Sequence, residues 1–501
     1  MSLATTFSRA QLGVDAPLVT VEADINQGLP QIVIVGLPET AVRESKDRVK
    51  AALSNSGFTL PSRRVTINLA PADLPKQGGR YDLAIAMALL AASDQIDASW
   101  INDQEYLGEL SLAGELRAVN GVLPAVLAAK VAQRRLFLPA VNQNEASLVS
   151  QADVCIVDSL AEVVQQLRGA QETRKPQRQS DTLVEEPLLL SDVKGQYLAK
   201  RALVIAAAGA HNLLMVGPPG TGKTMLAKRL PSLLPTMTEK ESLDSAVIQS
   251  VSARSTYNGK LGQRPFRSPH HTASAVALVG GGNPPVPGEI SLAHQGILFL
   301  DELPEFSRNV LEVLREPLES GQIVISRAQH SVTFPSQFQL VSAMNPCPCG
   351  YFGDGTARCD CRLDQIDKYR NKVSGPLLDR IDLHIKVPPL KKGELSQSSV
   401  VSREGEKKDS IEAARWQMIS RSGKPNAHLT GKELERHCRL ASRDKELLEH
   451  AMQSLSLSVR GYYRTLKVAR TIADLSGVIG NIETPHLTEA LAFRSITSAV
   501  T

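Results

Sequence analysis

The stretch Leu213-Leu-Met-Val216, followed by Gly217-Pro-Pro-Gly-Thr-Gly-Lys223-Thr224, decides the fold of this 501-residue chain. An apolar run, a glycine-rich loop and a Lys-Thr pair form the pattern of a phosphate-binding P-loop between a strand and a helix. Glycines are needed because backbone N–H groups must turn toward phosphate oxygens, in conformations that a Cβ opposes. We expect a helix over Thr224–Leu234, and we expect these residues to bind nucleotide: Gly217, Pro218, Pro219, Gly220, Thr221, Gly222, Lys223 and Thr224.

A second apolar run, Ile297–Leu300, ends in the carboxylates Asp301 and Glu302. The carboxyl ends of parallel strands are where such sheets bind ligands. We therefore expect Asp301 to hold Mg²⁺ together with the Thr224 hydroxyl, and Glu302 to act as the general base for an attacking water. With Lys223 reaching the β- and γ-phosphates, the sequence predicts an ATPase that uses ATP and Mg²⁺.

Composition limits the other possibilities. Charged residues make up 22% of the chain and apolar residues 42%, which excludes disorder over most of its length. The longest apolar runs, Leu83–Ala92 and Ala202–Ala210, are shorter than the roughly 18 residues of a membrane span. The first residues have no basic head before an apolar stretch, so we expect a cytoplasmic protein without membrane contact. The net charge of +4 permits nucleic-acid binding but does not by itself predict it.

Two polar stretches, 168–187 and 391–409, are expected to be linkers. They leave an N-terminal α/β domain (1–167), a central domain (188–390) whose alternating strands and helices predict a mainly parallel sheet, and a helical domain (410–501). Further expected strands are Gln31–Val35, Arg64–Leu69, Ile323–Ser326, Ser331–Phe334 and Phe338–Ala343. Further expected helices are Thr40–Ser54, Leu83–Ala92, Leu123–Ala132, Arg443–Ser454, Tyr463–Leu475 and one that starts at Thr484.

Four of the six cysteines cluster at Cys347, Cys349, Cys359 and Cys361. In a reducing compartment such clustering favours a metal over disulfides, and four thiolates satisfy a closed tetrahedral Zn²⁺ site. We expect structural zinc here; reduced thiols are the alternative, and an iron–sulfur cluster fits less well.

Three polar side chains extend the predicted nucleotide site. Asn345 follows the strand 338–343, where an amide can orient the attacking water, the role called sensor 1 in AAA+ proteins. The segment 374–383 around Arg380 resembles the one that carries the arginine finger in the AAA+ branch of Mg-chelatase motors and replicative helicases. Ser458-Val-Arg460-Gly461 resembles the sensor 2 of that branch. The alternative for each arginine is a surface ion pair.

Longer segments make the resemblance specific over almost the whole chain: Ile34–Ser45, Asn68–Lys76, Arg264–His271, Pro287–His294 and Ala469–Leu475. On these residues the chain resembles the ComM/YifB type of bacterial Mg-chelatase-like AAA+ proteins. The resemblance implies a homohexameric, ATP-driven DNA motor or helicase. Such a motor promotes branch migration as DNA is integrated in natural transformation (competence) and recombination. It implies DNA as partner, single-stranded, duplex or branched, and makes recombination proteins candidate partners.

Two regions are candidates for DNA contact. In the helicase branch an insertion before the acidic strand faces the pore, so Arg264 and Arg267 are expected to meet phosphates regardless of sequence, the alternative being a rigid loop against a neighbouring copy. The hairpin pattern of Ile323–Phe334 has a polar tip with Arg327 and His330, expected to grip the DNA strand. The tandem histidines at 270 and 271 are expected to be structural.

The N-terminal domain resembles the proteolytic domain of Lon proteases, an α/β fold of the ribosomal S5 domain 2 type, through Leu74–Asp82 and Gly108–Gly114. In this resemblance the Lon serine falls at Arg80 and its lysine near Leu123, so we expect the fold without the protease reaction. Two other functions compete with the DNA motor: a Mg-chelatase-type motor subunit, and a protein-remodelling AAA+ ATPase without DNA activity.

Overall fold

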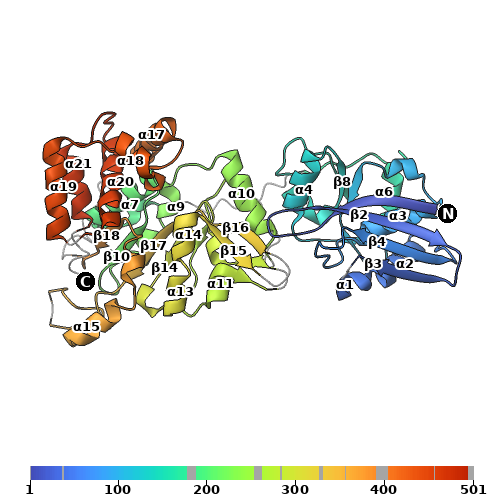
Figure 1. Ribbon diagram of the computed structural model, residues 1–501, viewed down its shortest axis with the longest axis horizontal. Coiled ribbons are helices and arrows are strands. Elements are labelled where there is room, and N and C mark those ends of the chain that lie inside the picture. The colour runs from blue at the N-terminus through green and yellow to red at the C-terminus, as the bar shows by residue number, and fades with distance from the viewer. Residues whose placement is uncertain are drawn as a thin grey trace.

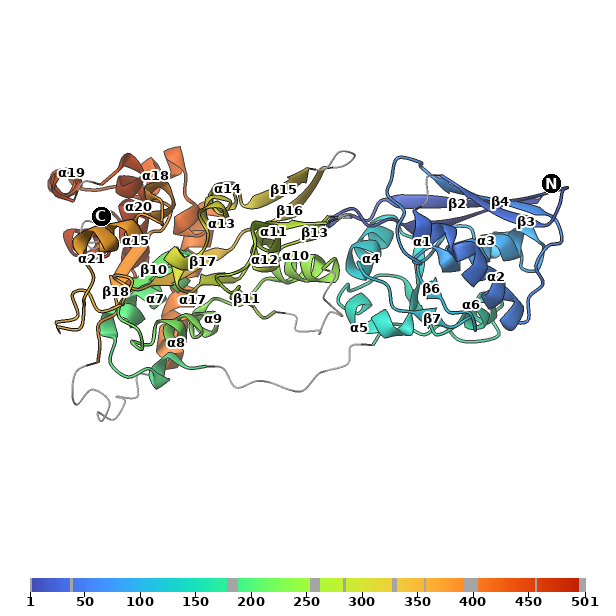
Figure 2. The same cartoon turned by 90° about the horizontal axis from the view of Figure 1, so that it is seen from below.

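The computed structural model describes residues 2–36, 39–177, 188–252, 262–282, 285–326, 331–355, 357–390, 404–455 and 457–494. The molecule is elongated, with an N-terminal α/β unit at one end, a central α/β unit in the middle and a group of helices at the other end (Figure 1, Figure 2). Within these residues, none of the helices combines the length and the apolar character that crossing a membrane requires.

The N-terminal unit is built on a seven-stranded sheet. Its strands are β1 (Ser2–Arg9), β2 (Leu18–Asn26), β3 (Gln31–Val35), β4 (Arg64–Ala70), β5 (Gln104–Tyr106), β8 (Arg135–Pro139) and β9 (Val154–Val157), and β6 (Glu109–Leu110) pairs separately with β7 (Leu116–Arg117). Its helices are α1 (Thr40–Arg43), α2 (Ser45–Asn55), α3 (Asp82–Ala92), α4 (Val122–Val131), α5 (Gln143–Ala146) and α6 (Leu160–Leu167).

The sheet order is β3-β4-β2-β1-β5-β8-β9. Side chains of β2 alternate between buried and partly exposed along its length, so one face of the sheet is packed. Helix α3 lies against β1 and β2 with all of its residues buried, because its run of alanines, leucines and isoleucine is apolar on every side. The mixture of strands and helices expected here is confirmed.

The central unit contains the P-loop. Its strands are β10 (Leu213–Val216), β11 (Phe266–Arg267), β12 (Gly280–Gly281), β13 (Val286–Pro287), β14 (Ile297–Leu300), β15 (Gln322–Ser326), β16 (Ser331–Pro335), β17 (Gln339–Met344) and β18 (Leu383–Lys386). Its helices are α7 (Tyr197–Gly209), α8 (Lys223–Ala227), α9 (Leu230–Leu233), α10 (Glu239–Ser250), α11 (Ala275–Val279), α12 (Glu289–Leu292), α13 (Arg308–Glu312), α14 (Arg315–Ser320), α15 (Leu363–Arg370) and α16 (Gly375–Leu378).

The five strands β11-β14-β17-β10-β18 form a parallel sheet in this order. Both of its faces are covered: Leu213 and Met215 of β10 pack in one apolar cluster with α7, and Leu214 and Val216 pack in another with α13 and the hairpin β15–β16. Burial on both faces explains why these strands are continuous apolar runs. The mainly parallel sheet predicted from the sequence is confirmed.

The C-terminal helices are α17 (Glu404–Ser422), α18 (Gly431–His437), α19 (Ser442–Ser454), α20 (Val459–Leu475) and α21 (Thr484–Ala492). They share one apolar cluster with α7 of the central unit (Figure 1). Because α17 begins at Glu404, the helical part starts earlier than residue 410. Polar residues such as these are compatible with a linker and equally compatible with the first turns of a helix.

Helix α10 connects the central and N-terminal units. Its residues Leu243, Ala246 and Val247 pack in the same apolar cluster as α4. A second contact joins the loop around Leu12 and Val14 to the cluster that contains the hairpin β15–β16. The N-terminal unit is therefore held against two elements of the nucleotide-binding unit.

Candidate nucleotide-binding site

The glycine-rich loop lies between β10 and α8, which starts at Lys223. Gly220 and Gly222 have φ angles of 75° and 88°, and a Cβ on either would meet no atom within 4 Å. Backbone conformation, not crowding, therefore requires glycine, and the loop keeps an open concave side that suits a chain of phosphates. A pocket of about 340 Å³ is lined by Pro219, Gly220, Thr221, Gly222, Lys223, Thr224, Met225, Asp301, Glu302, Met344 and Asn345.

Lys223 is buried at the base of this pocket. Its Nζ donates hydrogen bonds to the carbonyl oxygens of residues 217 and 218, at 2.6 and 2.9 Å, and to Oδ1 of Asn345 at 3.1 Å. Burial lowers the pKa of Lys223, and the nearby carboxylates of Asp301 and Glu302 oppose that shift. An ammonium held mainly by neutral oxygens is well suited to receive phosphate oxygens.

The acidic residues meet the P-loop at the carboxyl end of the sheet. The Thr224 hydroxyl donates to Oδ2 of Asp301 over 2.6 Å, so both predicted Mg²⁺ ligands lie within reach of one ion. Glu302 follows with a φ of 53°, a left-handed backbone that non-glycine residues adopt rarely. Asn345 directly follows β17, the strand between β10 and β14, and its amide lies beside Lys223. The residues present thus fit ATP and Mg²⁺.

Arg380 and Arg460 converge on a third residue, Glu319 of α14. Nη2 of Arg380 lies 2.6 Å, and Nη2 of Arg460 3.5 Å, from Oε1 of Glu319. Neither arginine is among the residues that line the pocket around Lys223. Within a single chain both arginines therefore make ion pairs. The action of Arg380 as an arginine finger and of Arg460 as sensor 2 stays a prediction, and for Arg460 the nucleotide of its own copy and that of a neighbour are both open.

Asp382 ties the Arg380 segment to helix α20. One of its oxygens is 2.6 Å from Nη1 of Arg464, which also donates to the carbonyl oxygen of Arg380 over 2.8 Å. Its other oxygen faces Nδ1 of His211 at 3.5 Å. Burial alone would raise the pKa of Asp382, but Arg464 and His211 outweigh it and hold the pKa well below its usual range. Arg380 and Arg460 are thus both connected to α20: Arg460 is part of it, and the Arg380 segment is bonded to Arg464 of that helix.

The two arginines predicted to meet DNA phosphates both have partners within the chain. The guanidinium of Arg264 donates to the carbonyl oxygens of residues 235 and 295, both at 2.8 Å, and pairs with Glu241 at 3.3 Å. A phosphate contact would have to replace these bonds, so the contact of Arg264 with DNA stays a prediction. Arg267 is partly exposed and held by both oxygens of Glu289, at 2.7 and 2.9 Å, so a phosphate contact would have to replace this pair.

The predicted hairpin is present as the antiparallel pair β15–β16, in which Ser326 faces Ser331. Arg327 and His330 lie outside the described residues, so their contact with DNA stays a prediction. Figure 2 shows β15 and β16 extending from the central unit on the side that faces the N-terminal unit.

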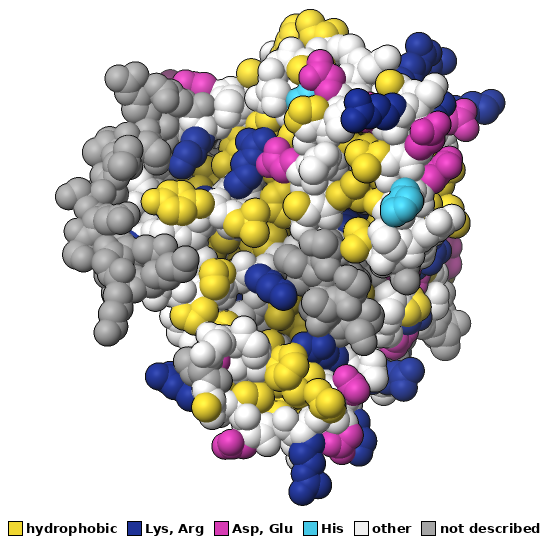
Figure 3. All heavy atoms as spheres, turned by 90° about the vertical axis from the view of Figure 1, so that its left-hand side faces the viewer, with side chains coloured by type: hydrophobic (Ala, Val, Ile, Leu, Met, Phe, Trp, Pro, Cys, Tyr) yellow, Lys and Arg dark blue, Asp and Glu magenta, His cyan; other side chains and the backbone are white. Residues whose placement is uncertain are grey.

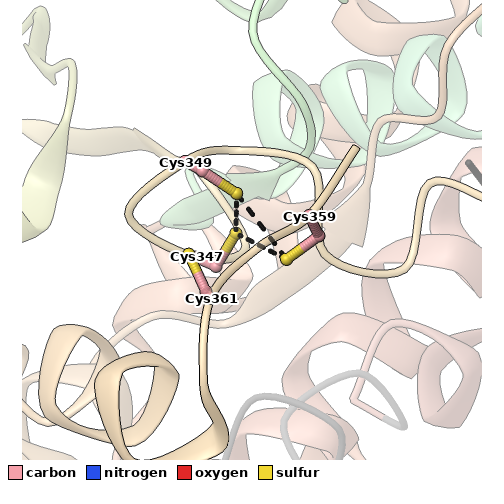
Figure 4. Close-up of side chains that lie close together, drawn as sticks. All are labelled: Cys347, Cys349, Cys359 and Cys361. Carbon is pink, nitrogen blue, oxygen red and sulfur yellow. Dashed lines mark hydrogen bonds between the residues drawn. The ribbon is translucent and has the colours of Figure 1, made fainter. Parts of the chain in front are cut away.

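The sulfurs of Cys347, Cys349, Cys359 and Cys361 gather in the loop region that follows Asn345 (Figure 4). All four lie within 4.8 Å of one another, and the closest are Cys347 to Cys349 at 3.3 Å and Cys349 to Cys359 at 3.6 Å. Zn–S bonds of about 2.3 Å place tetrahedral sulfurs roughly 3.8 Å apart. None of the six cysteines forms a disulfide. The donor set and its spacing therefore fit Zn²⁺.

The two positions aligned with the Lon dyad are occupied by packing residues. Arg80 is buried and donates to Oε1 of Gln11 at 3.2 Å. Leu123 is buried in the apolar cluster that includes α10. Neither side chain is a nucleophile or a base for one, so the expected absence of Lon chemistry at these positions remains our prediction.

Two functional candidates were not anticipated. Glu319 belongs to no sequence motif. Its candidate role is evident only from its ion pairs with Arg380 and Arg460 in the folded chain. His271 was expected to be structural, yet its Nδ1 lies 3.2 Å from Oε2 of Glu302. The sequence signal for His271 is its position shortly after β11, the strand that pairs with β14. Because β11 has only two residues, it is hard to recognise as a strand in the sequence.

A parallel sheet with a P-loop, an acidic strand end and an amide on the strand between them defines a P-loop nucleotide-binding protein of the AAA+ class. The sequence matches the families described as "Magnesium chelatase, subunit ChlI" (residues 189–395), "Subunit ChlI of Mg-chelatase" (21–142) and "Magnesium chelatase, subunit ChlI C-terminal" (403–494).

Similar proteins include the competence protein ComM of Haemophilus influenzae, 50% identical over 99% of this chain and 98% of that protein. The protein YifB of Escherichia coli is 47% identical over the same shares of the two chains. The magnesium-chelatase 38 kDa subunit of Cereibacter sphaeroides is 27% identical over 32% of this chain and 54% of its own. The chain belongs to the ComM/YifB-type family of Mg-chelatase-like AAA+ proteins, which implies ATP and Mg²⁺ as its cofactors.

Proposed function

We propose that this chain is an ATP-driven DNA motor that works as a homohexamer and promotes branch migration when transforming or recombining DNA is integrated. The observation that carries the proposal is the meeting of Lys223, the Thr224–Asp301 pair and Glu302 in one pocket. The similarity over the full length to a protein named for competence supports DNA as the substrate of the motor.

Each residue of the pocket has a part in hydrolysis. Lys223 would bind the β- and γ-phosphates, and Thr224 with Asp301 would hold Mg²⁺, which neutralises phosphate charge when bound. Glu302 would take a proton from the attacking water, which Asn345 orients. Arg380 would be supplied by a neighbouring copy, and Arg460 by the same or a neighbouring copy, where a guanidinium stabilises charge on the transferred phosphate.

DNA contact is proposed for the hairpin β15–β16 through Arg327 and His330, with Arg267 as a further candidate. One cation per copy, arranged around a ring, holds the DNA backbone without reading bases. The four cysteines would hold structural Zn²⁺, which closes a loop that contains little apolar material of its own.

A Mg-chelatase-type motor is the second candidate, because all three matching families are named for that enzyme. The two candidates differ in what stimulates hydrolysis. We expect ATP hydrolysis by the purified chain to rise severalfold with single-stranded or branched DNA, at low salt where phosphate contacts are strong. A rate that is the same with every DNA would contradict the DNA motor.

Two substitutions test the assignment of the pocket. Lys223→Ala is expected to abolish nucleotide binding because it removes the only pocket cation described. Glu302→Gln is expected to bind ATP normally and to hydrolyse it about 10²–10⁴-fold more slowly, the usual contribution of a general base. Binding of a fluorescent ATP analogue and phosphate release separate the two effects. Near-normal turnover by Glu302→Gln would contradict the role of Glu302.

A further inference from the structure

The hairpin formed by β1 and β2 continues beyond the N-terminal sheet and ends against the central unit. After the two strands, the N–H of Ala10 donates to the carbonyl oxygen of Pro17 at 2.9 Å. Leu12 and Asp15 then exchange two backbone hydrogen bonds of 3.0 and 3.1 Å, which close a tight turn. Figure 1 shows this dark-blue end beside β15 and β16. Residues 11–14 form the bridge segment of the N-terminal unit.

The bridge segment packs on one face of the hairpin β15–β16. Leu12 and Val14 are partly buried against the apolar cluster that contains Val332 and Phe334 of β16. Gly13, which lies between them, is buried and has a φ of 60°. A Cβ on Gly13 would overlap Cγ1 of Val332. The turn and β16 are therefore so close that only a glycine fits between them in this conformation.

The bridge segment also contacts the C-terminal end of α10. Val14 packs in the apolar cluster of α4 and α10 as well as in that of the hairpin. Nε2 of Gln11 lies 3.5 Å from the carbonyl oxygen of Val251, the residue directly after α10. The buried Arg80 orients Gln11 by donating to its Oε1 at 3.2 Å. Four consecutive residues thus join the hairpin and α10.

The N-terminal end of α10 is connected to the strand that carries the acidic residues. Arg264 donates to the carbonyl oxygen of Gln295, two residues before β14, at 2.8 Å. The same guanidinium pairs at 3.3 Å with Glu241 in the first turn of α10. Because β14 leads directly to Asp301 and Glu302, we expect a shift of this strand during hydrolysis to reach α10, a rigid element that ends at the bridge segment.

A two-stranded hairpin is only marginally stable by itself, so the position of β15–β16 depends on what packs against it. We infer that the bridge segment is a positioning element that ties this hairpin to α10, so that the two move together in each cycle of ATP hydrolysis. This inference rests on the proposed function, which assigns hydrolysis to the pocket around Lys223 and DNA contact to the hairpin. It gives the N-terminal unit a part in moving DNA without a chemical step of its own.

The test measures how much strand displacement on a forked DNA oligonucleotide full-length Gly13→Ala achieves for each ATP hydrolysed. The added Cβ pushes the turn away from β16. We therefore expect this coupling ratio to fall by about tenfold, a size that packed contacts can transmit, while hydrolysis without DNA stays within about twofold of the wild type. Gly57→Ala is the matched control: its φ is 81° and its Cβ would meet no atom within 4 Å, so it adds comparable backbone strain and keeps the ratio.

Two further variants separate the contact from a general loss of stability. In Gly13→Ala/Val332→Ala the overlapping methyl group is absent, and the atoms nearest the new Cβ are Cβ of residue 332 at 3.7 Å and Cε1 of Phe334 at 3.8 Å, ordinary van der Waals distances. We expect this double variant to recover most of the coupling ratio. Leu12→Ala, which loosens the contact without backbone strain, is expected to lower the ratio by about threefold. Leu29→Ala, an exposed leucine between β2 and β3, is its control.

Hydrogen–deuterium exchange of the β15 and β16 amides reports the contact without DNA. We expect faster exchange in Gly13→Ala and exchange like the wild type in the double variant. Faster exchange with an unchanged coupling ratio overturns the inference, because the contact is then only structural, and unchanged exchange overturns it as well. If the wild type displaces no DNA strand, the DNA motor fails. A change of exchange in β15–β16 on binding a non-hydrolysable ATP analogue, abolished by Gly13→Ala, would still support the link to α10, and its persistence in that variant would contradict the link.

Discussion

Cys347 links the cysteine cluster to the nucleotide pocket. Its carbonyl oxygen accepts the N–H of Gly350 at 3.0 Å, and its sulfur accepts the N–H of Phe352 at 3.3 Å. Gly350 lies so close to the P-loop that a Cβ on it would be 2.6 Å from Cδ of Pro219. We therefore expect a change in the cluster to reach the predicted phosphate-binding loop.

Replacing one cysteine of the cluster is predicted to change the zinc content of the protein. We expect Cys359→Ser to lower bound zinc from about one per chain to below about 0.1, because serine is a poor replacement for a thiolate ligand. ATP hydrolysis is expected to fall with it, since the loop beside Pro219 loses its cross-link. Elemental analysis of protein purified without chelator, together with phosphate release, measures both quantities.

The control is Cys155→Ala, which removes a buried cysteine of the N-terminal unit and is expected to leave the zinc content unchanged. If the wild type itself carries no metal, the zinc site is contradicted.

The predicted site residues that the structure brings together in one pocket have positions fixed by local chain direction. Lys223 and Thr224 are set by the glycines before them, and Asp301 by the end of an apolar strand. The pairing of His271 with Glu302, and the contacts of Arg264 within the chain, depend on which strands and loops become neighbours in space. A sequence motif contains no information about which strands pair or in which register, so the motifs could not predict these contacts.

At the scale of elements, α10 is joined to the N-terminal unit by a buried carboxylate. Glu145 accepts the N–H of Leu123 at 2.9 Å and the hydroxyl proton of Ser250, the last residue of α10. Gly121 also donates to the carbonyl oxygen of Ser250 at 3.0 Å. Burial raises the pKa of Glu145, although its hydrogen bonds from Ser250 and Leu123 oppose the shift.

The raised pKa of Glu145 predicts that the free energy of unfolding depends on pH. In the folded chain Glu145 stays protonated at pH values above its ordinary pKa of 4.5. The contribution of its protonated form to the free energy of unfolding is therefore complete below about pH 4.5, and it is lost as the pH rises through the raised pKa. Glu145→Gln keeps a neutral acceptor at every pH. We expect the wild-type Tm to fall relative to this variant between about pH 5 and pH 8, by roughly 2–4 °C for each kcal/mol of difference.

Thermal unfolding followed by circular dichroism measures this difference. Glu172→Gln, an exposed change of the same charge, is the control and should follow the wild type at both pH values. A constant offset between Glu145→Gln and the wild type across pH would contradict the raised pKa.

The boundaries of the strands and helices show which features can be predicted from the local sequence. The strands at Leu213–Val216 and Ile297–Leu300, and the hairpin, have the predicted positions because apolar runs bounded by polar residues are local signals. The single helix expected over Thr224–Leu234 is wrong: the chain forms α8 and α9. Pro231 has no N–H and its ring clashes with the carbonyl four residues earlier, so a new helix starts around it.

At the scale of the whole molecule, the exposed Arg460 marks a surface separate from the chain's own pocket, and the buried Arg380 lies beside it on the same partner, Glu319. On α20, Val459 and Tyr463 flank Arg460 and are 66% and 44% exposed. Figure 3 shows that hydrophobic side chains gather among lysines and arginines at this end of the molecule. Apolar side chains beside charged ones suit a surface covered by another copy. A contact of this surface with the next copy's pocket, repeated around an axis, closes a ring.

Mixing two inactive variants tests a site shared in this way. Glu302→Gln copies keep Arg380, and Arg380→Ala copies keep Glu302, so each variant alone lacks one half of every site. In rings formed at random from equal amounts, about a quarter of the contacts combine an intact pocket with an intact arginine. We therefore expect the mixture to recover up to about a quarter of the wild-type rate of phosphate release, while each variant alone stays near zero. Glu302→Gln mixed with Lys223→Ala is the control, because both changes damage the pocket half and no contact becomes complete. Recovery in that control, or none in the first mixture when mixed rings are seen by native mass spectrometry, would contradict a site built from two copies.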